Sequence, residues 1–265
     1  MVLDINHQIM HINKAARERL DIDDNCANDL MGHCYHHIHA IDHPPGDCPH
    51  MALLADRQPH ETEVFMPRLN GYFHITVNPT FDADGNLVGA VHVARDITIR
   101  RAMEDQLRYL GTHDELTKLN NRTYFEAEVD RLKRGKITPL SVVIADVDGL
   151  KDINDRYGHD HGDAYIRAAA DTLKDIFRPD DTIARIGGDE FAVLLKGVGE
   201  DILYGLMQRA RQMLSEGTHQ TEHGHKVQFS MGSTTIRHPS ELDRAIRDAD
   251  MAMYADKKVR KTKKT

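Results

Sequence analysis

The chain has 265 residues, with 34 Lys and Arg against 42 Asp and Glu, which gives a net charge of −8 at pH 7. This length favours two domains, and a hydrophobic fraction of 40% is enough to bury a core in each. No apolar run approaches the roughly 18–20 residues that cross a bilayer, and the first ten residues lack the pattern of a signal peptide. The composition therefore predicts a cytoplasmic protein without a membrane segment, and its acidic balance argues against specific binding of nucleic acid.

Histidine and cysteine divide the chain into two chemically different parts. Eleven of the 18 histidines lie in the first 106 residues, together with all three cysteines, Cys26, Cys34 and Cys48. An odd number of cysteines gives no complete disulfide framework, which agrees with reduced thiols in the cytosol. Basic residues crowd the carboxyl end, where phosphate contact or solubility explains them as well as a role on DNA does: Lys257, Lys258, Arg260, Lys261, Lys263 and Lys264.

The first part of the chain has the pattern of an antiparallel sheet with one buried face. Residues 8–12 alternate like a strand, and Asn13 is placed to cap a helix over residues 14–20. Residues 21–60 are polar, rich in His, Asp and Pro, and weakly patterned. Three strands are predicted after them, with a tight turn at residues 82–85 between the last two: 63–68, 71–79 and 87–94.

A helical linker is expected over residues 97–110. Ile99, Met103, Gln106 and Leu110 recur at spacings of four, three and four, which is typical of a coiled-coil seam with one polar position. Two heptads fit a plain amphipathic connector equally well, so both interpretations remain open.

The second part alternates between helix and strand, which predicts an α/β sandwich with a mixed sheet. Residues 140–145 form a continuous apolar run, as in a central strand that is buried on both faces. Together with the first part, this pattern makes an α+β protein. The remaining predicted strands are 182–185, 191–195 and 227–236, and the predicted helices are 121–134, 162–177, 202–215 and 242–254.

Two pairs of acidic residues lie at predicted strand ends, where they could bind the metal ions of a phosphate-transfer reaction. Asp146 and Asp148 follow the buried strand directly, and Asp189 and Glu190 follow two glycines. Mg²⁺ takes one or two carboxylates together with phosphate oxygens, so the pairs could hold ions for displacement at phosphorus. Asp146 and Asp189 can lie side by side only if their strands are neighbours. A solvated strand end and an ordinary type I′ hairpin are the structural alternatives.

Residues 185–191, Arg-Ile-Gly-Gly-Asp-Glu-Phe, resemble the signature of GGDEF domains, the diguanylate cyclases. Further segments resemble other motifs of this family in the right order: 114–122, 146–163, 230–233 and 249–257. The resemblance covers residues 107–260 and implies a fold related to nucleotidyl cyclases and polymerase palm domains. It also implies that a homodimer condenses two GTP into cyclic di-GMP and releases two pyrophosphates.

The resemblance assigns metal and catalytic roles to three acidic residues and one carbonyl group. Two divalent ions per active site, Mg²⁺ or Mn²⁺, would bind Asp146, the carbonyl oxygen of Val147, and Asp189. Asp189 or Glu190 would help to deprotonate the 3′-hydroxyl of GTP.

The resemblance also implies contacts to the substrate. Asn154 and Asp163 would hydrogen bond the guanine edge, although Asn154 could simply cap a helix. Lys151, Lys257 and Lys261 would meet the triphosphate, and the alternative for Lys151 is a solvated side chain.

Arg178 and Asp181 have the R-x-x-D spacing, and their position matches the inhibitory product site of the family. An arginine fork grips phosphate or guanine, and an aspartate takes the guanine donors. The alternative is a salt bridge at the end of a helix. If the resemblance holds here, cyclic di-GMP inhibits its own synthesis.

The sequence departs from the family in two places. The family has an aromatic side chain at the position of Gly149 or Leu150, and a Gly-Arg pair where Arg260 and Lys261 stand. Lys261 would serve phosphate as a point charge, without the guanidinium fork. Because the acidic signature is intact, an active enzyme is favoured over an inactive receptor that binds GTP or cyclic di-GMP and signals by contact.

The front of the chain resembles a PAS sensor domain. The resemblance rests on residues 9–20, on residues 71–94, and on Asp96-Ile97-Thr98, which is similar to the motif that joins PAS domains to an output helix. It implies a sensor domain over residues 1–98, a linker over 99–110 and a cyclase domain over 111–265.

Residues 32–50 resemble a Cys-Tyr…Cys-Pro stretch of some PAS domains, except that Pro45 stands where a further cysteine is common. Cys34, Cys48, His36 and His50 are the candidates there for a Zn²⁺ or haem site. A polar loop over the PAS pocket and a thiol redox switch are the alternatives, and the PAS ligand is left open.

Overall fold

The structure is a computed structural model that describes residues 1–21, 32–217, 220–221 and 223–263. Backbone contacts divide the chain into two units, Met1–Gln106 and Leu107–Thr265. The division falls inside one helix, α4 (Thr98–Thr112). Each unit has its own sheet and its own buried core, as the sequence predicted for an α+β protein.

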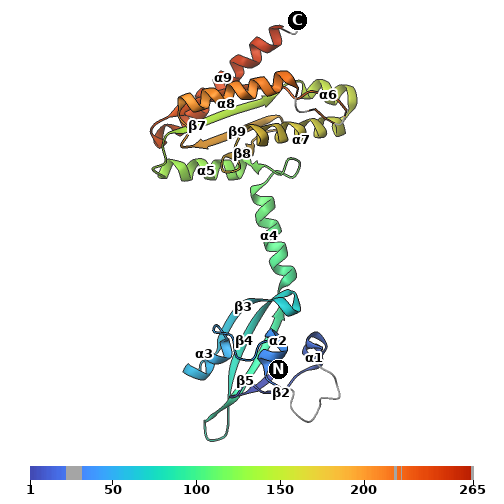
Figure 1. Ribbon diagram of the computed structural model, residues 1–265, viewed down its shortest axis with the longest axis vertical. Helices are drawn as coiled ribbons and strands as arrows, with labels where there is room; N and C mark the ends of the chain where they lie inside the picture. Colours follow the sequence, from blue (N-terminus) through green and yellow to red (C-terminus); the bar gives the residue numbers. More distant parts are fainter. Residues whose placement is uncertain (22–31, 218–219, 222, 264–265) are drawn as a thin grey trace. The chain divides into compact units, whose positions relative to one another are not determined.

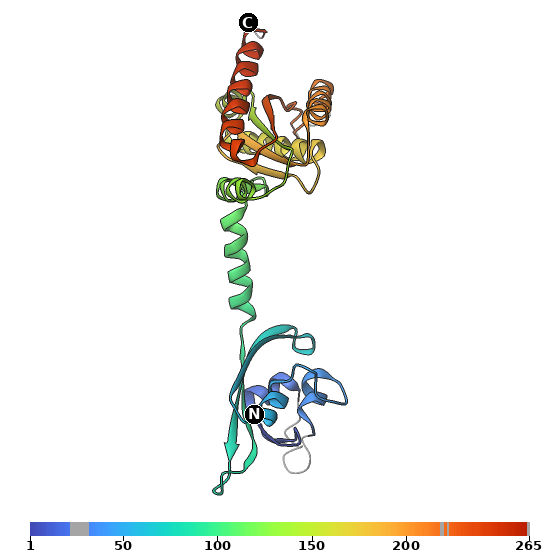
Figure 2. The same ribbon diagram turned by 90° about the vertical axis from the view of Figure 1, so that its left-hand side faces the viewer.

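The first unit is a five-stranded antiparallel sheet with helices on one face (Figure 2). Its strand order is β2-β1-β5-β4-β3. The strands are β1 (Val2–Asp4), β2 (Ile9–His11), β3 (His60–Met66), β4 (Gly71–Phe81) and β5 (Leu87–Asp96). The predicted strands at 71–79 and 87–94 are confirmed, and so is the turn at Asp82, where Gly85 donates its backbone N–H to the Asp82 carbonyl at 3.1 Å. The strand predicted over 63–68 instead begins at His60 and ends at Met66, because Pro67 begins a short 3-10 helix.

Three α-helices accompany this sheet in the described residues, and the sequence had indicated only the first. In α1 (Lys14–Leu20), Oδ1 of Asn13 accepts the backbone N–H of Ala16 at 3.1 Å, so the predicted cap is confirmed. Helices α2 (Cys34–His39) and α3 (Pro49–Asp56) lie within the weakly patterned stretch, of which residues 22–31 are outside the described residues. Their apolar faces are narrow, and tertiary packing of Cys34 and Leu53 decides them.

Helix α4 begins directly after β5 and is joined to the first unit by polar contacts. Oδ1 of Asp96 accepts the Thr98 backbone N–H at 2.9 Å, and Thr98 Oγ1 accepts the Tyr72 N–H at 2.9 Å. Glu63 on β3 pairs with both Arg100 and Arg101. The predicted helix in this stretch is confirmed, and its role as a linker stays a prediction.

The apolar stripe of α4 is open in the single chain. Ile99, Met103 and Leu107 are 72%, 60% and 69% exposed. The coiled-coil seam stays a prediction, because the structure describes one chain. Across the described residues, no helix combines the length and apolar character that a membrane crossing requires.

The second unit is a mixed sheet, labelled in Figure 1, with helices on both of its faces. Its strand order is β10-β7-β9-β8-β6; the β6–β8 pair is parallel, and the other described pairs are antiparallel. The strands are β6 (Asn120–Asn121), β7 (Leu140–Val147), β8 (Thr182–Arg185), β9 (Glu190–Lys196) and β10 (Phe229–Ile236). The helices are α5 (Arg122–Arg134), α6 (Leu150–Tyr157), α7 (His159–Ile176), α8 (Glu200–Glu216) and α9 (Leu242–Lys263).

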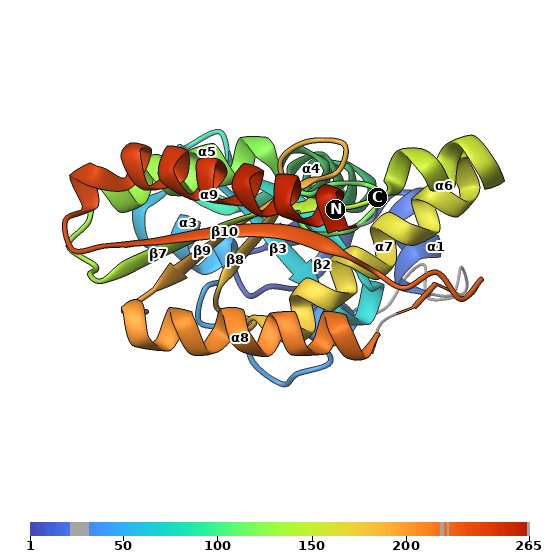
Figure 3. The same cartoon turned by 90° about the horizontal axis from the view of Figure 1, so that it is seen from above.

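The central position of strand β7 in the sheet explains its continuous apolar sequence. Val143 and Ala145 face the core under α7 and α8, whereas Val142 and Ile144 face the core under α5 and α9. Figure 3 shows these helices on opposite faces of the sheet. A strand that is buried on both faces carries no polar alternation, so the prediction of a central strand is confirmed.

The sequence analysis missed α6 and ended the last helix too early. Helix α6 spans only two turns and has no buried residue, so its apolar period is weak. Helix α9 continues past the predicted end at residue 254 to Lys263, because its last turns carry no helix-breaking residue.

Candidate functional site

The site lies where β7 and β9 end side by side. The two strands pair antiparallel, with Asp146 opposite Glu190, and the Val147 N–H donates to the Asp189 carbonyl at 2.9 Å. The strands are therefore neighbours, which was the condition for bringing Asp146 and Asp189 together. Asp146 is buried, Asp189 is half-buried and Glu190 is exposed.

Two residues from distant parts of the chain contact this acidic group. Nζ of Lys257, on α9, donates to Oδ1 of Asp146 at 2.6 Å. Oγ of Ser230, on β10, donates to Oδ1 of Asp148 at 2.7 Å. Lys257 thus reaches a carboxylate here, and contact with a triphosphate stays a prediction.

The electrostatics of the group favour a bound cation. Burial raises the pKa of Asp146, and the charges of Asp189 and Asp148 act in the same direction, against the hydrogen bond from Lys257. Burial alone would lower the pKa of Lys257, but its bond to Asp146 and the other carboxylates raise it overall. Three carboxylates thus share one ammonium group, which leaves an excess of negative charge.

The oxygen ligands at this site suit Mg²⁺, which completes its coordination with water and phosphate, better than they suit a metal that needs all of its ligands from the protein. Within the described part of the chain, no three His, Cys, Asp or Glu side chains come together as a complete metal site. Mg²⁺ binds through one or two carboxylates and keeps its other positions for water and phosphate oxygens. Asp146 and Asp189, with the carbonyl of Val147, match that incomplete set.

The glycine hairpin between β8 and β9 holds Asp189 without a type I′ turn. Neither Gly187 nor Gly188 has a positive φ, whereas a type I′ turn requires it at both central positions. A Cβ atom at Gly187 would lie 2.6 Å from Oε2 of Glu190, so glycine there leaves room for that carboxylate. The hairpin alternative in its type I′ form is therefore wrong.

Arg185 fixes this hairpin. Its Nη2 donates to the Gly188 carbonyl at 2.8 Å, and its Nη1 donates to both carboxylate oxygens of Asp114 at 3.1 and 3.2 Å. Asp114 also accepts the backbone N–H of Thr117 at 2.9 Å. Burial alone would raise the pKa of Asp114, but the bonds from Thr117 and Arg185 outweigh it and lower the pKa.

Helix α6 and the start of α7 carry the predicted guanine-binding residues. Oδ1 of Asn154 is buried and has no hydrogen-bond partner among the described residues. Gly162 faces it so closely that a Cβ atom there would lie 1.9 Å from that oxygen. A buried amide oxygen without a partner is costly, so this position is suited to a ligand that donates a hydrogen bond.

The other predicted substrate residues lie on α6, α7 and α9. Asp163 is exposed on α7, and Lys151 is exposed on α6. Lys261 lies within α9, and its side chain is outside the described residues. Gly149 has a φ of +83°, a conformation in which a side chain is strained.

A family model for the diguanylate cyclase GGDEF domain matches residues 111–263, and a PAS domain model matches residues 1–98. The chain belongs to the GGDEF family of diguanylate cyclases. Its fold agrees with the coiled coil and GGDEF domain of DgcB from Caulobacter crescentus, solved with c-di-GMP. The TM-score is 0.56 at 26% identity, over 61% of this chain and 88% of that one.

Curated relatives of this PAS–GGDEF chain are longer proteins. It is 33% identical to the probable diguanylate cyclase DgcE of Escherichia coli over 190 residues, which are 69% of this chain and 17% of that protein. It is 34% identical to the diguanylate cyclase DosC of Escherichia coli over 173 residues, or 63% of this chain and 37% of DosC. The chain thus spans well under two thirds of these relatives.

Three supporting contacts in the GGDEF domain were missed by the sequence analysis. They are the Arg185–Asp114 pair, the Ser230–Asp148 bond and the Lys257–Asp146 bond. All of these residues lie inside segments that resemble family motifs, and this resemblance indicated that the residues belong to the site. The sequence could not predict which residues bond to each other, because each bond joins residues that are 71 to 111 positions apart.

Among the described residues, Arg178 and Asp181 of the R-x-x-D segment form no side-chain salt bridge with each other. Oδ2 of Asp181 accepts the backbone N–H of Arg178 at 2.9 Å, and the Arg178 side chain is exposed. The carboxylate therefore fixes the backbone of the turn after α7. A role in product binding stays a prediction.

In the described part of the PAS domain, the candidates His50 and His36 have other partners. The ring of His50 is fully buried and uses both nitrogens, with Nδ1 at 2.9 Å from Nε2 of His92 and Nε2 at 3.1 Å from the Asp4 carbonyl. His36 pairs with Asp42 at 3.5 Å.

Cys34 is buried. Burial, the larger cause, and the nearby Cys48, the smaller one, raise the pKa of the Cys34 thiol to about 12. No complete ligand set of His, Cys, Asp and Glu occurs in the described ranges, and the zinc, haem and redox alternatives stay predictions.

Proposed function

We propose that this chain is a metal-dependent diguanylate cyclase that condenses two GTP into cyclic di-GMP and releases two pyrophosphates. The cyclase domain would span residues 111–265, with residues 1–98 as sensor and 99–110 as linker. Support comes from the family match and from DgcB, which was solved with c-di-GMP. The observation that carries the proposal is the meeting of Asp146 and Asp189 at adjacent strand ends, beside Lys257.

The acidic group would bind the triphosphate through two divalent ions. Asp146, Asp189 and the carbonyl of Val147 would hold Mg²⁺ or Mn²⁺, which supplies neutralisation of phosphate charge when bound. Lys257 partly neutralises Asp146 in the chain alone. It would turn to phosphate oxygens once cations share that carboxylate.

The reaction would be an in-line displacement at the α-phosphorus of one GTP by the 3′-hydroxyl of the other. A new O–P bond forms, the bond to pyrophosphate breaks, and the hydroxyl proton passes to Asp189 or Glu190. Both carboxylates lie at the start of β9, where Arg185 holds the hairpin backbone. Repeating the step closes the ring, so two subunits must each present one GTP. Catalysis would rest on positioning and charge neutralisation.

Guanine recognition would use α6 and α7. The N1 and N2 positions of guanine are donors, and the buried Oδ1 of Asn154 is an acceptor without a partner in the described structure. Asp163 would accept the second donor from the first turns of α7. Lys151 and Lys261 would add charge near the phosphates.

Regulation would act at two levels. A change in the PAS domain would shift α4, whose exposed apolar stripe would pack against a second copy, and so change the fraction of productive dimers. Cyclic di-GMP would inhibit by binding Arg178 and Asp181 on the exposed turn after α7.

The test is direct. Purified protein, stripped of bound nucleotide, is incubated with GTP and Mg²⁺, and the nucleotides are separated by chromatography beside Asp189→Ala. We expect cyclic di-GMP from the unmodified chain alone. An inactive receptor would instead bind GTP or cyclic di-GMP without turnover, with and without Mn²⁺, in both the full chain and an artificially dimerised one.

A further inference from the structure

The PAS domain has a partly open cavity of about 580 Å³ between its sheet and helices α1 to α3. Most of its wall is apolar, including Leu20, Val64, Leu69, Phe73 and Ile75. This volume falls within the roughly 300–1,000 Å³ of pockets that take small organic molecules. The wall therefore favours a ligand with an apolar body.

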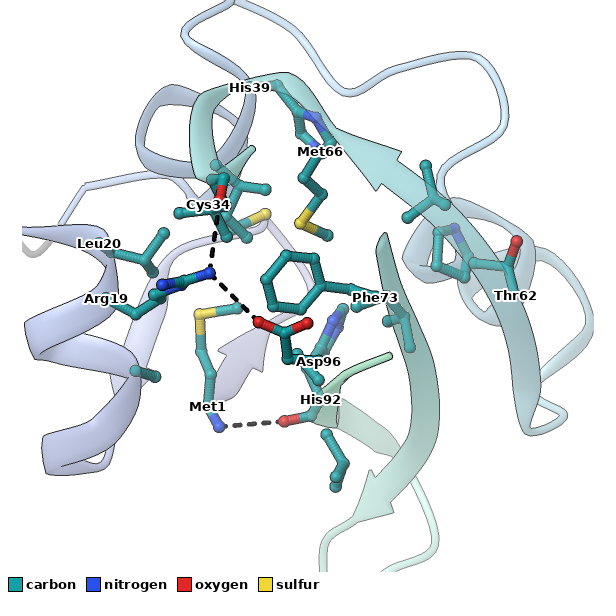
Figure 4. A pocket seen from close by; sticks show the side chains of 18 of the residues that line it. Met1, Arg19, Leu20, Cys34, His39, Thr62, Met66, Phe73, His92 and Asp96 are labelled. Atoms are coloured by element: carbon teal, nitrogen blue, oxygen red, sulfur yellow. Dashed lines mark hydrogen bonds and ion pairs between the residues drawn. The ribbon is translucent and has the colours of Figure 1, made fainter. Parts of the chain in front are cut away.

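One arginine reaches into this apolar wall (Figure 4). Nη2 of Arg19 donates to Oδ2 of Asp96 at 3.2 Å and to the Leu69 carbonyl at 3.4 Å, and its guanidinium lies 6.0 Å from the centre of the Phe73 ring. Among the described contacts, Nε and Nη1 of Arg19 make no hydrogen bond. The fork that suits a carboxylate is therefore largely unused.

The acidic residues of the cavity are less available than Arg19. Oδ1 of Asp96 accepts the Thr98 N–H and Oδ2 accepts Arg19, so both oxygens are engaged. Asp47 is exposed to solvent. The free donors on Arg19 thus favour an anionic ligand group over a cationic one.

We propose that this cavity binds a small monocarboxylate with an apolar tail, whose carboxylate pairs with Arg19. The tail packs against Phe73, Ile75 and Val64, and the carboxylate competes with Asp96 for the guanidinium. The Arg19–Asp96 pair is about half exposed, at 52% and 46%, and exposed pairs are weak. A carboxylate can therefore replace Asp96 at small cost.

The replacement would be felt at the linker. Asp96 also accepts the Thr98 N–H that begins α4, so the binding site and the start of α4 share one side chain. When a ligand carboxylate takes the Arg19 guanidinium from Asp96, the Asp96 carboxylate keeps its hydrogen bond to Thr98.

The test uses the full chain with octanoate as the probe, and octanol and octylamine as probes of equal tail length. Binding is measured by calorimetry and by the thermal shift of the protein. We expect octanoate to bind at least tenfold more tightly than either neutral or cationic probe. Arg19→Gln should weaken octanoate binding about tenfold or more and leave octanol binding unchanged.

Two further variants test whether octanoate binding depends on the pairing of its carboxylate with Arg19 rather than on the overall charge of the protein. Lys14→Gln removes one positive charge from the same helix, outside the cavity, and should not change octanoate binding. Asp96→Asn removes the competitor and should tighten it. Equal binding of the three probes, no binding of any of them at millimolar concentration, or unchanged octanoate affinity in Arg19→Gln would overturn the proposal.

Discussion

Replacing Gly162 by alanine should separate substrate recognition from fold stability. Gly162 lies in α7 and does not have a positive φ, so the backbone accepts alanine. The added Cβ would lie 1.9 Å from Oδ1 of Asn154 and 2.8 Å from its Cγ. Real Cβ contacts stay beyond 3.0 Å, so the amide must move by about 1 Å.

The structure sets the size of this effect. Alanine in a helix interior is favoured over glycine by about 1 kcal/mol, which offsets part of the strain of moving Asn154. We therefore expect a change of about 1 kcal/mol or less in the unfolding free energy. Loss of one hydrogen bond to guanine, about 0.5–1.5 kcal/mol, should raise the Kd for GTP about 2- to 12-fold.

The assay is calorimetric titration with GTP, beside urea denaturation of the same protein. Gly205→Ala is the matched control, because Gly205 lies on α8 with nothing within 4 Å of the added Cβ. It should gain stability and keep the Kd. If Gly162→Ala binds GTP as tightly as the unmodified chain, the position of Asn154 does not set guanine recognition.

Three further predictions follow from other parts of the structure. Arg185→Lys keeps the charge but cannot bond Gly188 and both oxygens of Asp114 together. We expect kcat for cyclic di-GMP formation to fall about tenfold with little change in the Kd for GTP, whereas the exposed Arg209→Lys should keep its activity. Equal kcat in both variants would contradict a role of Arg185 in holding the glycine hairpin. Gly232→Ala would place a Cβ 2.1 Å from the Ala249 carbonyl oxygen on α9, so urea denaturation should show a loss of about 3 kcal/mol, and a neutral result would mean that α9 moves freely. Burial lowers the pKa of His50 to about 4 and of His92 to about 3. The unfolded chain binds these protons below about pH 6.5, so the unfolding free energy should fall by about 2–4 kcal/mol from pH 7 to pH 5. Denaturation followed by circular dichroism checks this, and His92→Gln should flatten the profile.

Features whose cause is local were predictable from the sequence. Asn13 caps α1 because an Asn oxygen reaches the N–H three residues ahead, and the alternation of residues 71–79 follows from the two-residue period of a strand. The continuous apolar run of β7 required burial on both faces. The order of acidic and glycine motifs indicated the family, which the family model confirms.

Short helices with weak patterns were beyond the sequence analysis. Helices α2, α3 and α6 have six to eight residues, too few turns for an apolar period to stand out. Helices of this length are marginal alone, and contacts with the rest of the fold hold them. The buried pairing of His50 with His92 has the same origin, because α3 carries one ring onto β5.

The residue types at the site were determined by the sequence, and their meeting was decided by the tertiary structure. Strand order β10-β7-β9 sets Asp146 beside Asp189 and brings Ser230 to Asp148. The bond from Lys257 to Asp146 spans 111 residues. Periodicity reports which face of an element is buried, but it carries no record of which strand lies next to which. That pairing depends on the packing of whole layers, and only the folded chain supplies it.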